Sequence, residues 1–233
     1  MHGQSFLHDA MDSNLLKSVP LFSSMSEEQL RLLHPCLQHR RYSRGNYILR
    51  EGDQTNALYL IVSGKVKILI KDKQGREVIL AFLGKNDFFG EMGLLDGQPS
   101  SASVETIEEC HFLQLSKAGF LAALQQNFEL AMVIVNNLVK RLRVADRKIE
   151  SLALIDVYGR VARLLMDESE LVNGTLVVLK PPSKQEIARI IGASREMVSR
   201  VIKDLQLRGC IRLEKRKIFI LDQFSINKSA SDI

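Results

Sequence analysis

One short stretch near the C-terminus gathers side chains that can hydrogen-bond to the edges of DNA bases. Arg195 and Glu196 follow a serine suited to cap a helix, and Arg200 stands little more than one helical turn further along. An arginine can donate two parallel hydrogen bonds to guanine O6 and N7, and a glutamate can accept one from cytosine N4. The outward face of the expected helix carries Arg195, Glu196, Ser199, Arg200 and Lys203. This face predicts binding in the major groove, and the alternative is a solvated helix face held by salt bridges.

A helix-turn-helix over Ser183 to Arg208 explains how these side chains are presented. Ser183 and the glutamate three residues later have capping-box spacing, Gly192 supplies a tight turn, and Ser194 caps a second helix. The expected core positions are Ile187, Ala188 and Ile191 in the first helix and Val198, Val201, Ile202 and Leu205 in the second. The start of the first helix, with Ser183, Lys184 and Gln185, has the chemistry to hold a backbone phosphate.

The segment after this motif predicts a basic wing. Two short strands, Ile211 to Leu213 and Ile218 to Leu221, flank the charged turn Glu214-Lys215-Arg216-Lys217. Residues 181–233 hold 11 lysines and arginines against 6 acidic residues, whereas residues 1–180 hold 21 of each. The whole net charge of +5 therefore lies in the last quarter of the chain. Such a segment is stabilised by releasing counterions from a phosphate backbone, so it indicates a winged helix-turn-helix bound to DNA.

The region from about Arg41 to Leu115 predicts an antiparallel β-roll. Runs of branched residues separated by glycines are typical of closely spaced strands. These runs are Tyr47-Ile48-Leu49, Leu58 to Val62, Val66 to Ile70 and Val78 to Phe82. Short helices are expected before the roll at Leu15 to Val19 and at Ser26 to Leu37, with Ser26 as N-cap, and another is expected after Ser116.

A long helix is predicted from Phe128 to Ile155. Its apolar stripe steps by three or four residues through Ala131, Ile134, Leu138, Leu142, Ala145, Ile149 and Leu152. A helix of this length with a continuous stripe favours a coiled-coil partner and hence a homodimer, and the alternative is packing on its own domain. A further helix is expected at Asp156 to Leu171, then a turn at Asn173-Gly174 between strands.

These elements predict an α+β chain of three parts. Residues 1–127 form the β-roll, residues 128–156 the dimerisation helix, and residues 157–233 the winged helix-turn-helix domain. Asp156, between the long helix and the last domain, is expected to act as a hinge.

The remaining composition excludes several classes of protein. The three cysteines, Cys36, Cys110 and Cys210, and the five histidines are scattered without metal-ligand spacing, so no metal is expected. No nucleophile–base set or phosphate loop appears, so we do not expect an enzyme. No apolar run approaches the roughly 20 residues of a membrane span, and the N-terminus lacks the order of a secretory signal, so a cytoplasmic location is expected.

Over nearly its whole length the chain resembles the CRP/FNR family of bacterial transcription regulators. The matching segments are Gly45 to Ile48, Glu51 to Asp53, Leu60 to Val66, Phe89 to Leu95, the long helix and Ile190 to Arg200. The resemblance implies a cyclic-nucleotide-binding β-roll, a dimerising helix and a winged helix-turn-helix. It also implies an activator or repressor of transcription that works with RNA polymerase. Palindromic double-stranded DNA with TGTGA-like half-sites would be recognised through Arg195, Glu196 and Arg200.

Two departures from the family pattern argue against cAMP as the effector. Gly90 and Glu91 match the effector-binding pair, but Ser100-Ser101 stands where cAMP-binding members carry an Arg-Ser that neutralises the cyclic phosphate. Losing that charge-assisted bond costs roughly 1.5–3 kcal/mol. On the long helix, Ala145-Asp146 replaces the Thr-Ser that contacts adenine, and an acidic group disfavours an anion.

Cyclic di-GMP is the effector that fits these residues better. Guanine needs a carboxylate for N1–H and N2–H₂ and an arginine for O6 or N7. Arg143 and Asp146 supply both on one helical face in an Arg-x-x-Asp spacing that resembles cyclic di-GMP sites, with Arg147 beside them and Lys140 one turn earlier. A homodimer would duplicate these charges near its two-fold axis. The alternative is a solvated face of i,i+3 and i,i+4 pairs.

Other functions stay open beside a cyclic di-GMP regulator. They are a cAMP-responsive regulator, an effector-independent regulator, and a nucleotide-regulated interaction module that does not bind DNA. If a ligand binds at the junction of roll and helix, it must favour one dimer arrangement, and so set the spacing of the recognition helices. Half-sites one helical turn apart, about 34 Å, require that spacing.

Overall fold

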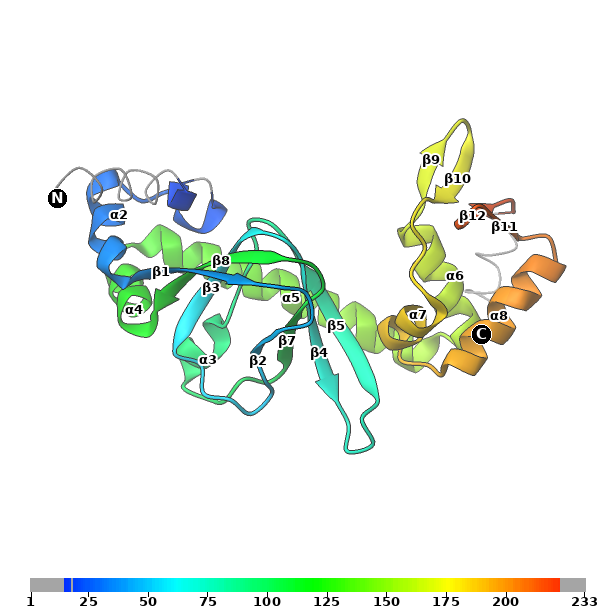
Figure 1. Cartoon of the computed structure of the whole chain (residues 1–233), viewed down its shortest axis with the longest axis horizontal. Helices are drawn as coiled ribbons and strands as arrows, with labels where there is room; N and C mark the ends of the chain where they lie inside the picture. Colours follow the sequence, from blue (N-terminus) through cyan, green and yellow to red (C-terminus); the bar gives the residue numbers. More distant parts are fainter. Residues whose placement is uncertain (1–14, 18, 223–233) are drawn as a thin grey trace. The chain divides into compact units, whose positions relative to one another are not determined.

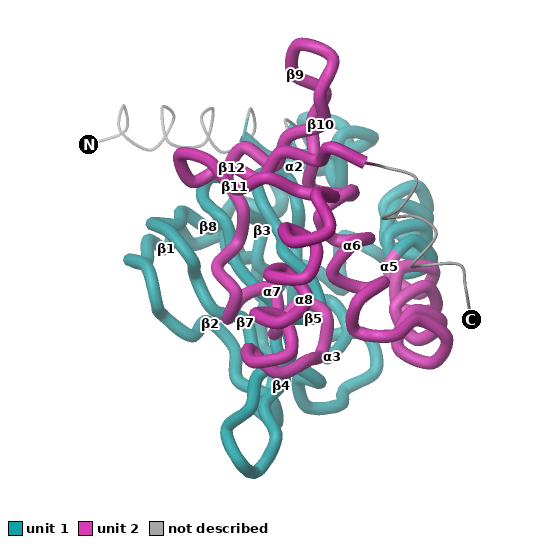
Figure 2. Tube along the Cα trace, turned by 90° about the vertical axis from the view of Figure 1, so that its right-hand side faces the viewer, with its two compact units in different colours: residues 1–140 teal, residues 141–233 magenta. Residues whose placement is uncertain are grey.

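The computed structural model describes residues 15–17 and 19–222. The chain divides into two compact units, residues 1–140 and 141–233, and the division falls inside the long helix α5 (Phe128–Leu154) (Figure 1, Figure 2). Each unit has its own sheet structure and its own hydrophobic core.

The first unit is a roll of two four-stranded antiparallel sheets, ordered β1-β8-β3-β6 and β2-β7-β4-β5. Its strands are β1 (Leu37–Tyr42), β2 (Tyr47–Leu49), β3 (Ala57–Ser63), β4 (Val66–Lys71), β5 (Glu77–Leu83), β6 (Phe88–Phe89), β7 (Ser103–Thr106) and β8 (Cys110–Ser116). Its shorter helices are η1 (Pro20–Phe22), α2 (Glu27–Leu33), η2 (His34–Cys36), α3 (Glu91–Asp96) and α4 (Lys117–Gln126).

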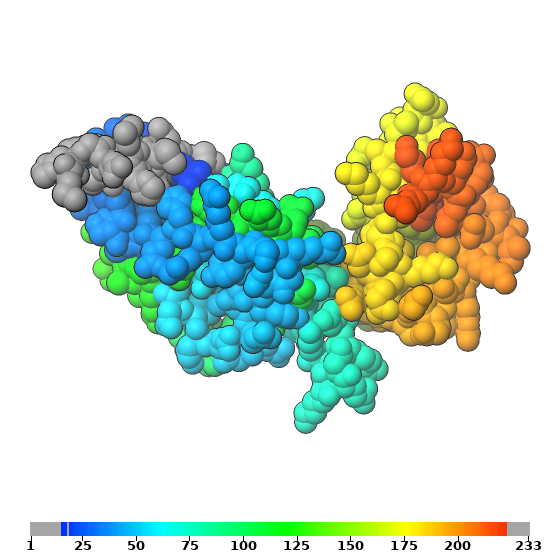
Figure 3. All heavy atoms as spheres, viewed as in Figure 1, coloured from blue at the N-terminus to red at the C-terminus, as the bar shows by residue number. Residues whose placement is uncertain are grey.

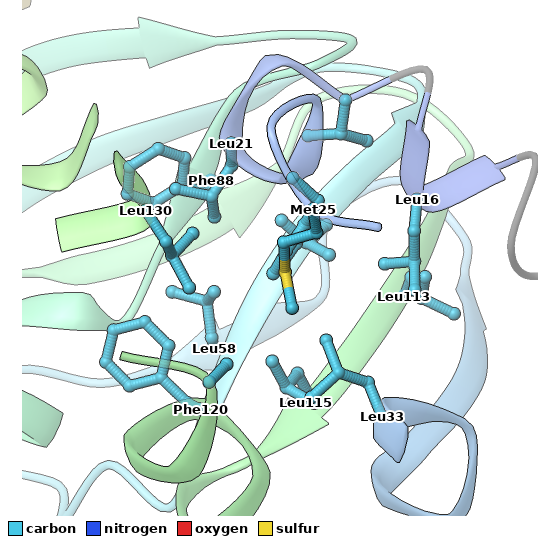
Figure 4. Close-up of a cluster of buried hydrophobic side chains, with 14 of the residues drawn as sticks. Leu16, Leu21, Met25, Leu33, Leu58, Phe88, Leu113, Leu115, Phe120 and Leu130 are labelled. Atoms are coloured by element: carbon cyan, nitrogen blue, oxygen red, sulfur yellow. The ribbon is translucent and has the colours of Figure 1, made fainter. Parts of the chain in front are cut away.

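Two apolar clusters hold this unit together. One lies between the sheets and includes Ile61, Val104 and Phe112. The other joins β3 and β8 to the helical segments, with Leu58, Leu113 and Leu115 of the strands against Phe120 of α4 and Leu130 of α5 (Figure 4). Successive side chains of a strand point to opposite faces, so β8 contributes to both clusters. The first sheet is therefore buried on both sides.

The second unit combines three helices with a small sheet of order β11-β12-β10-β9. Its elements are α6 (Val157–Asp167), β9 (Glu170–Val172), β10 (Thr175–Val178), α7 (Lys184–Ile191), α8 (Arg195–Leu207), β11 (Ile211–Glu214) and β12 (Lys217–Ile220). One core spans all three helices and the sheet. Gly192, at φ 65°, lies so close to Leu152 of α5 that an added Cβ would stand 3.3 Å from Leu152 Cδ2. The turn between α7 and α8 thus packs on the end of the long helix.

The predicted roll, long helix and helix-turn-helix are confirmed, but two helix ends were placed wrongly. The helix expected over Ser26 to Leu37 ends at Leu33, because Pro35 lacks an amide hydrogen, and Leu37 already begins β1. The helix expected over Asp156 to Leu171 ends at Asp167, since 170–172 pair with β10 across the Asn173-Gly174 turn. The first short helix, expected at Leu15 to Val19, includes Ser18, which lies outside the described residues.

The single apolar stripe expected on α5 is wrong for the first half of the helix. Ile134 is buried and Leu138 is packed against the core of the roll, so these positions face their own unit. The exposed apolar side chains belong to a neighbouring stripe in the first half, Met132, Val135 and Val139, which continues through Leu142 and Ile149. Their spacing, with Asp146 between the last two, follows a heptad and is typical of a coiled-coil seam.

Among the described helices, none alone has the length and apolar composition needed to cross a membrane. In the part of the chain that the structure describes, one pair, α4 and α5, reaches that length and composition together, but across a bend of 111°.

Candidate DNA-binding surface and effector-binding residues

The start of α7 is built as a capping box. Ser183 Oγ accepts a hydrogen bond from the Glu186 amide at 3.2 Å, and the Glu186 carboxylate accepts one from the Ser183 amide at 3.0 Å. Because the first amides of a helix have no acceptor within it, those of Lys184 and Gln185 remain available at the surface. Both side chains are exposed, as the predicted phosphate contacts require.

Helix α8 presents its predicted face to solvent. Ser194 Oγ accepts from the Met197 amide at 3.2 Å, which fixes the start of the helix. Val198, Val201, Ile202 and Leu205 are buried as expected. On the opposite side Arg195, Glu196, Arg200 and Lys203 are exposed and Ser199 is half-buried. Within the described part of the chain, none of these five side chains forms an ion pair or side-chain hydrogen bond. This face of α8 is therefore not held by salt bridges, and its side-chain donors and acceptors remain available to a ligand.

The wing is the β11–β12 hairpin, and its turn is shorter than expected. Glu214 pairs with Lys217, so only Lys215 and Arg216 form the turn, both with positive φ (48° and 61°). Arg212 lies over the Phe219 ring and approaches the Glu214 carboxylate at 3.6 Å, which braces the base of the hairpin. Both the wing, in red, and α7, in yellow to orange, lie at the surface of the second unit (Figure 3).

A cavity of about 320 Å³ separates the wing from the start of α7. Residues of three segments line it: Pro181, Pro182, Ser183, Lys184, Ile187, Ile202, Leu213, Glu214, Lys215, Arg216, Lys217 and Ile218. Sequence patterns did not reveal it, because its walls come from separate parts of the chain. The predicted phosphate contacts Ser183 and Lys184 thus share one hollow with the wing cations.

Comparison with known proteins gives the same two modules. The family model of the cyclic nucleotide-binding domain matches residues 39–127, and that of the Crp-like helix-turn-helix domain matches residues 159–224. The cAMP-activated global transcriptional regulator Vfr of Pseudomonas aeruginosa is 37% identical over 197 residues, which cover 82% of this chain and 92% of Vfr. The chain belongs to the CRP/FNR family. It is a DNA-binding transcriptional regulator with a cyclic nucleotide-binding domain, and its relatives are regulators rather than enzymes.

Two further relatives are similar to this CRP/FNR regulator over most of its length. The cAMP-activated global transcriptional regulator CRP of Escherichia coli O157:H7 is 33% identical over 195 residues, covering 81% of this chain and 91% of CRP. The solved structure of CLP of Xanthomonas campestris, described as a c-di-GMP responsive global regulator, is 28% identical, with a TM-score of 0.73. The match covers 84% of this chain and all of that one.

Close backbone packing surrounds the first of the effector residues predicted in the roll. Gly90 has φ 91°, and an added Cβ would stand 2.7 Å from the Ala57 carbonyl oxygen, so only glycine fits here. Glu91 follows it and is 1% exposed. The Ser100 hydroxyl donates to the Ala102 carbonyl at 2.8 Å, and Ser101 is exposed. The hydroxyl proton of Ser100 is therefore already donated to a backbone carbonyl, and the side chain has no positive charge to neutralise a phosphate.

The four predicted effector residues on α5 are all exposed. They are Lys140, Arg143, Asp146 and Arg147. Across the described residues, none of the four side chains takes part in an ion pair or a side-chain hydrogen bond, so this face is solvated but lacks the i,i+3 and i,i+4 pairs of the alternative interpretation. Asp146 also occupies a seam position of the exposed heptad. A carboxylate there would meet its own copy across a dimer axis.

Proposed function

We propose that this regulator binds, as a homodimer, to palindromic DNA with TGTGA-like half-sites, that it works there with RNA polymerase, and that cyclic di-GMP modulates the binding. The observation that carries the DNA proposal is the exposed, unpaired set Arg195, Glu196 and Arg200 on a helix whose other side is buried. Buried residues fix the helix, and its free donors and acceptors match guanine and cytosine edges.

The effector proposal rests on Arg143 and Asp146. Both are exposed and unpaired in the described structure, so a guanine base meets a free guanidinium and a free carboxylate. Asp146 stands at the seam, where two copies of its negative charge repel each other in a dimer. A ligand whose N1–H and N2–H₂ donate to these carboxylates relieves the repulsion. Two phosphates then meet the paired cations of Lys140, Arg143 and Arg147.

The Xanthomonas campestris relative CLP is described as c-di-GMP responsive, which supports the same effector class. The description of Vfr and CRP as cAMP-activated favours cAMP as the second candidate. Ser100 weighs against cAMP, because it offers a hydroxyl engaged with Ala102 where a cation is needed. A buried phosphate without a cation loses roughly 1.5–3 kcal/mol.

The switch follows from linkage. A ligand changes DNA affinity only by the difference in its affinity for two dimer arrangements. Asp156 is the proposed hinge: its carboxylate accepts from the Gly159 amide at 2.7 Å and so starts α6 directly after α5 ends. The capping bond holds the start of α6, which leaves the short α5–α6 link to change direction.

Calorimetry on the full chain with cyclic di-GMP, cAMP and cGMP in parallel tests the effector. We expect cyclic di-GMP to bind and Arg143→Ala or Asp146→Asn to weaken it by about 10- to 100-fold, the loss of one charge-assisted contact. Arg163→Ala, which removes an exposed arginine from α6, is the matched control and should leave the affinity unchanged. Unchanged affinity in both α5 variants, or tighter binding of cAMP, would contradict the proposal.

A further inference from the structure

The cavity between the wing and α7 is lined by apolar as well as charged side chains. Its accessible apolar wall is formed by Leu213, which is 45% exposed, and by the half-buried Pro181 and Pro182, whereas the isoleucines behind them belong to the core of this unit. The protein groups that contact a backbone phosphate are mainly cationic side chains and hydrogen-bond donors. The exposed leucine and the two prolines are therefore a feature that phosphate binding does not explain.

The rim of the same cavity is strongly cationic. Lys184, Lys215, Arg216 and Lys217 stand against the single carboxylate of Glu214. All four cations are exposed, and within the described residues they form no ion pair or side-chain hydrogen bond. Such a rim attracts an anion, and the apolar wall beside it lowers the local polarity and so strengthens that attraction.

We propose that this cavity binds a small amphipathic anion, a monocarboxylate with an apolar body, and that its occupant competes with DNA. Small-molecule sites are mostly apolar hollows of about 300–1,000 Å³ with a few polar groups that set orientation, and this cavity fits that description. The apolar body lies against Leu213, Pro181 and Pro182, and the carboxylate reaches the cationic rim. Because Ser183 and Lys184 are also the proposed phosphate contacts, the carboxylate and the DNA backbone exclude each other.

Titration of the full-length, DNA-free protein with decanoate tests the site, with decanol and acetate as probes that lack the charge or the apolar body. We expect decanoate to bind at least tenfold more tightly than either control. In amide NMR spectra its shifts should cluster at Lys184, Leu213 and Lys217. Leu213→Trp, at a position 45% exposed, should block the cavity and abolish the shifts, and Lys217→Gln should weaken decanoate but leave decanol unaffected.

Competition with DNA gives the second readout. Decanoate should raise the apparent Kd for DNA in the wild type but not in Leu213→Trp. Shifts confined to the exposed stripe of α5, or equal affinity for decanoate and decanol, would overturn the proposal. If Leu213→Trp disturbs the fold, the wild-type shift map alone decides. Since binding is measured without DNA or cyclic di-GMP, its failure is distinct from a failure of the proposed function.

Discussion

The Nδ1 atom of His39 lies 3.0 Å from the Nε2 atom of His111, and the two rings stack with centroids 5.2 Å apart. The pair joins β1, an edge strand of the first sheet, to β8. At this distance the two facing nitrogens can share one proton but cannot both carry one. Burial lowers the pKa of His111, and the positive charges of His39 and Arg41 lower it further.

We expect this pair to make the protein less stable in mild acid. The folded pKa of His111 is below its unfolded value of about 6.5, so the unfolded chain gains the proton first as the pH falls. The contribution of His111 is present above the unfolded pKa and is lost as the pH falls through that value toward the lower folded pKa. Chemical denaturation between pH 5 and pH 8 measures the slope.

His111→Gln should flatten that slope, whereas Gln114→Ala, which changes a side chain of β8 that does not titrate, should preserve it. An identical slope in wild type and His111→Gln would show that the acid sensitivity arises elsewhere.

This pair also shows what sequence patterns cannot provide. The strand that holds His39 reads Leu-Gln-His-Arg-Arg-Tyr, which lacks the apolar alternation of a half-buried strand. It is a strand because it pairs with β8, whose residues lie some 72 positions away along the chain. By contrast, β3 and β4 were predictable because their branched residues and flanking glycines are local signals.

In the wing turn, we expect the two cationic residues to lower the stability of the fold while their charges strengthen DNA binding. Both hairpins of the second unit turn on two residues with positive φ, but one uses Asn173-Gly174, the favoured pair, and the other uses Lys215-Arg216. Side chains with a bulky Cβ substituent disfavour this conformation. Replacing Lys215-Arg216 by Asn-Gly should therefore raise the free energy of unfolding by about 1–2 kcal/mol. It should also weaken DNA binding and reduce the salt slope by about two.

The double variant Lys215→Gln/Arg216→Gln is the matched control, because it removes the charges and keeps the strained backbone. It should lose DNA affinity equally and gain no stability. Full DNA affinity in both variants would show that the wing does not contact DNA.

Substitutions of Arg195 and Lys184 should affect DNA binding differently, because we expect Arg195 to contact a base and Lys184 to contact a phosphate. Arg195→Ala should cost about 1–3 kcal/mol on the preferred half-site and relax its preference at one base pair. Lys184→Gln should weaken binding to all duplexes alike and reduce the salt slope by about one. Fluorescence anisotropy on the preferred duplex and single-base variants, at several salt concentrations, measures both. Equal losses on every duplex for Arg195→Ala would place this arginine on the backbone rather than on a base.

The base-reading residues could be predicted from the sequence, but the cavity beside the phosphate contact could not. Helical periodicity alone assigns Arg195, Glu196 and Arg200 to the face of α8 opposite its buried positions, so their exposure could be predicted. The cavity beside Lys184 could not, because Pro182, Ile187 and Leu213 meet only after α7 and the wing have folded together.

The two stripes of α5 should respond differently to substitution. Val139, 42% exposed, belongs to the outward heptad, whereas its neighbour Leu138 packs against the core of the roll. Val139→Glu should therefore shift the protein to monomer, with weak DNA binding and an unchanged roll, because like charges would face each other across the seam. Leu138→Ala should lower the free energy of unfolding by up to about 2 kcal/mol, less than for a fully buried leucine, and leave the dimer intact. Sedimentation with parallel thermal unfolding distinguishes the two outcomes. If Leu138→Ala abolished the dimer and Val139→Glu preserved it, the dimer interface would instead be the stripe predicted from the sequence.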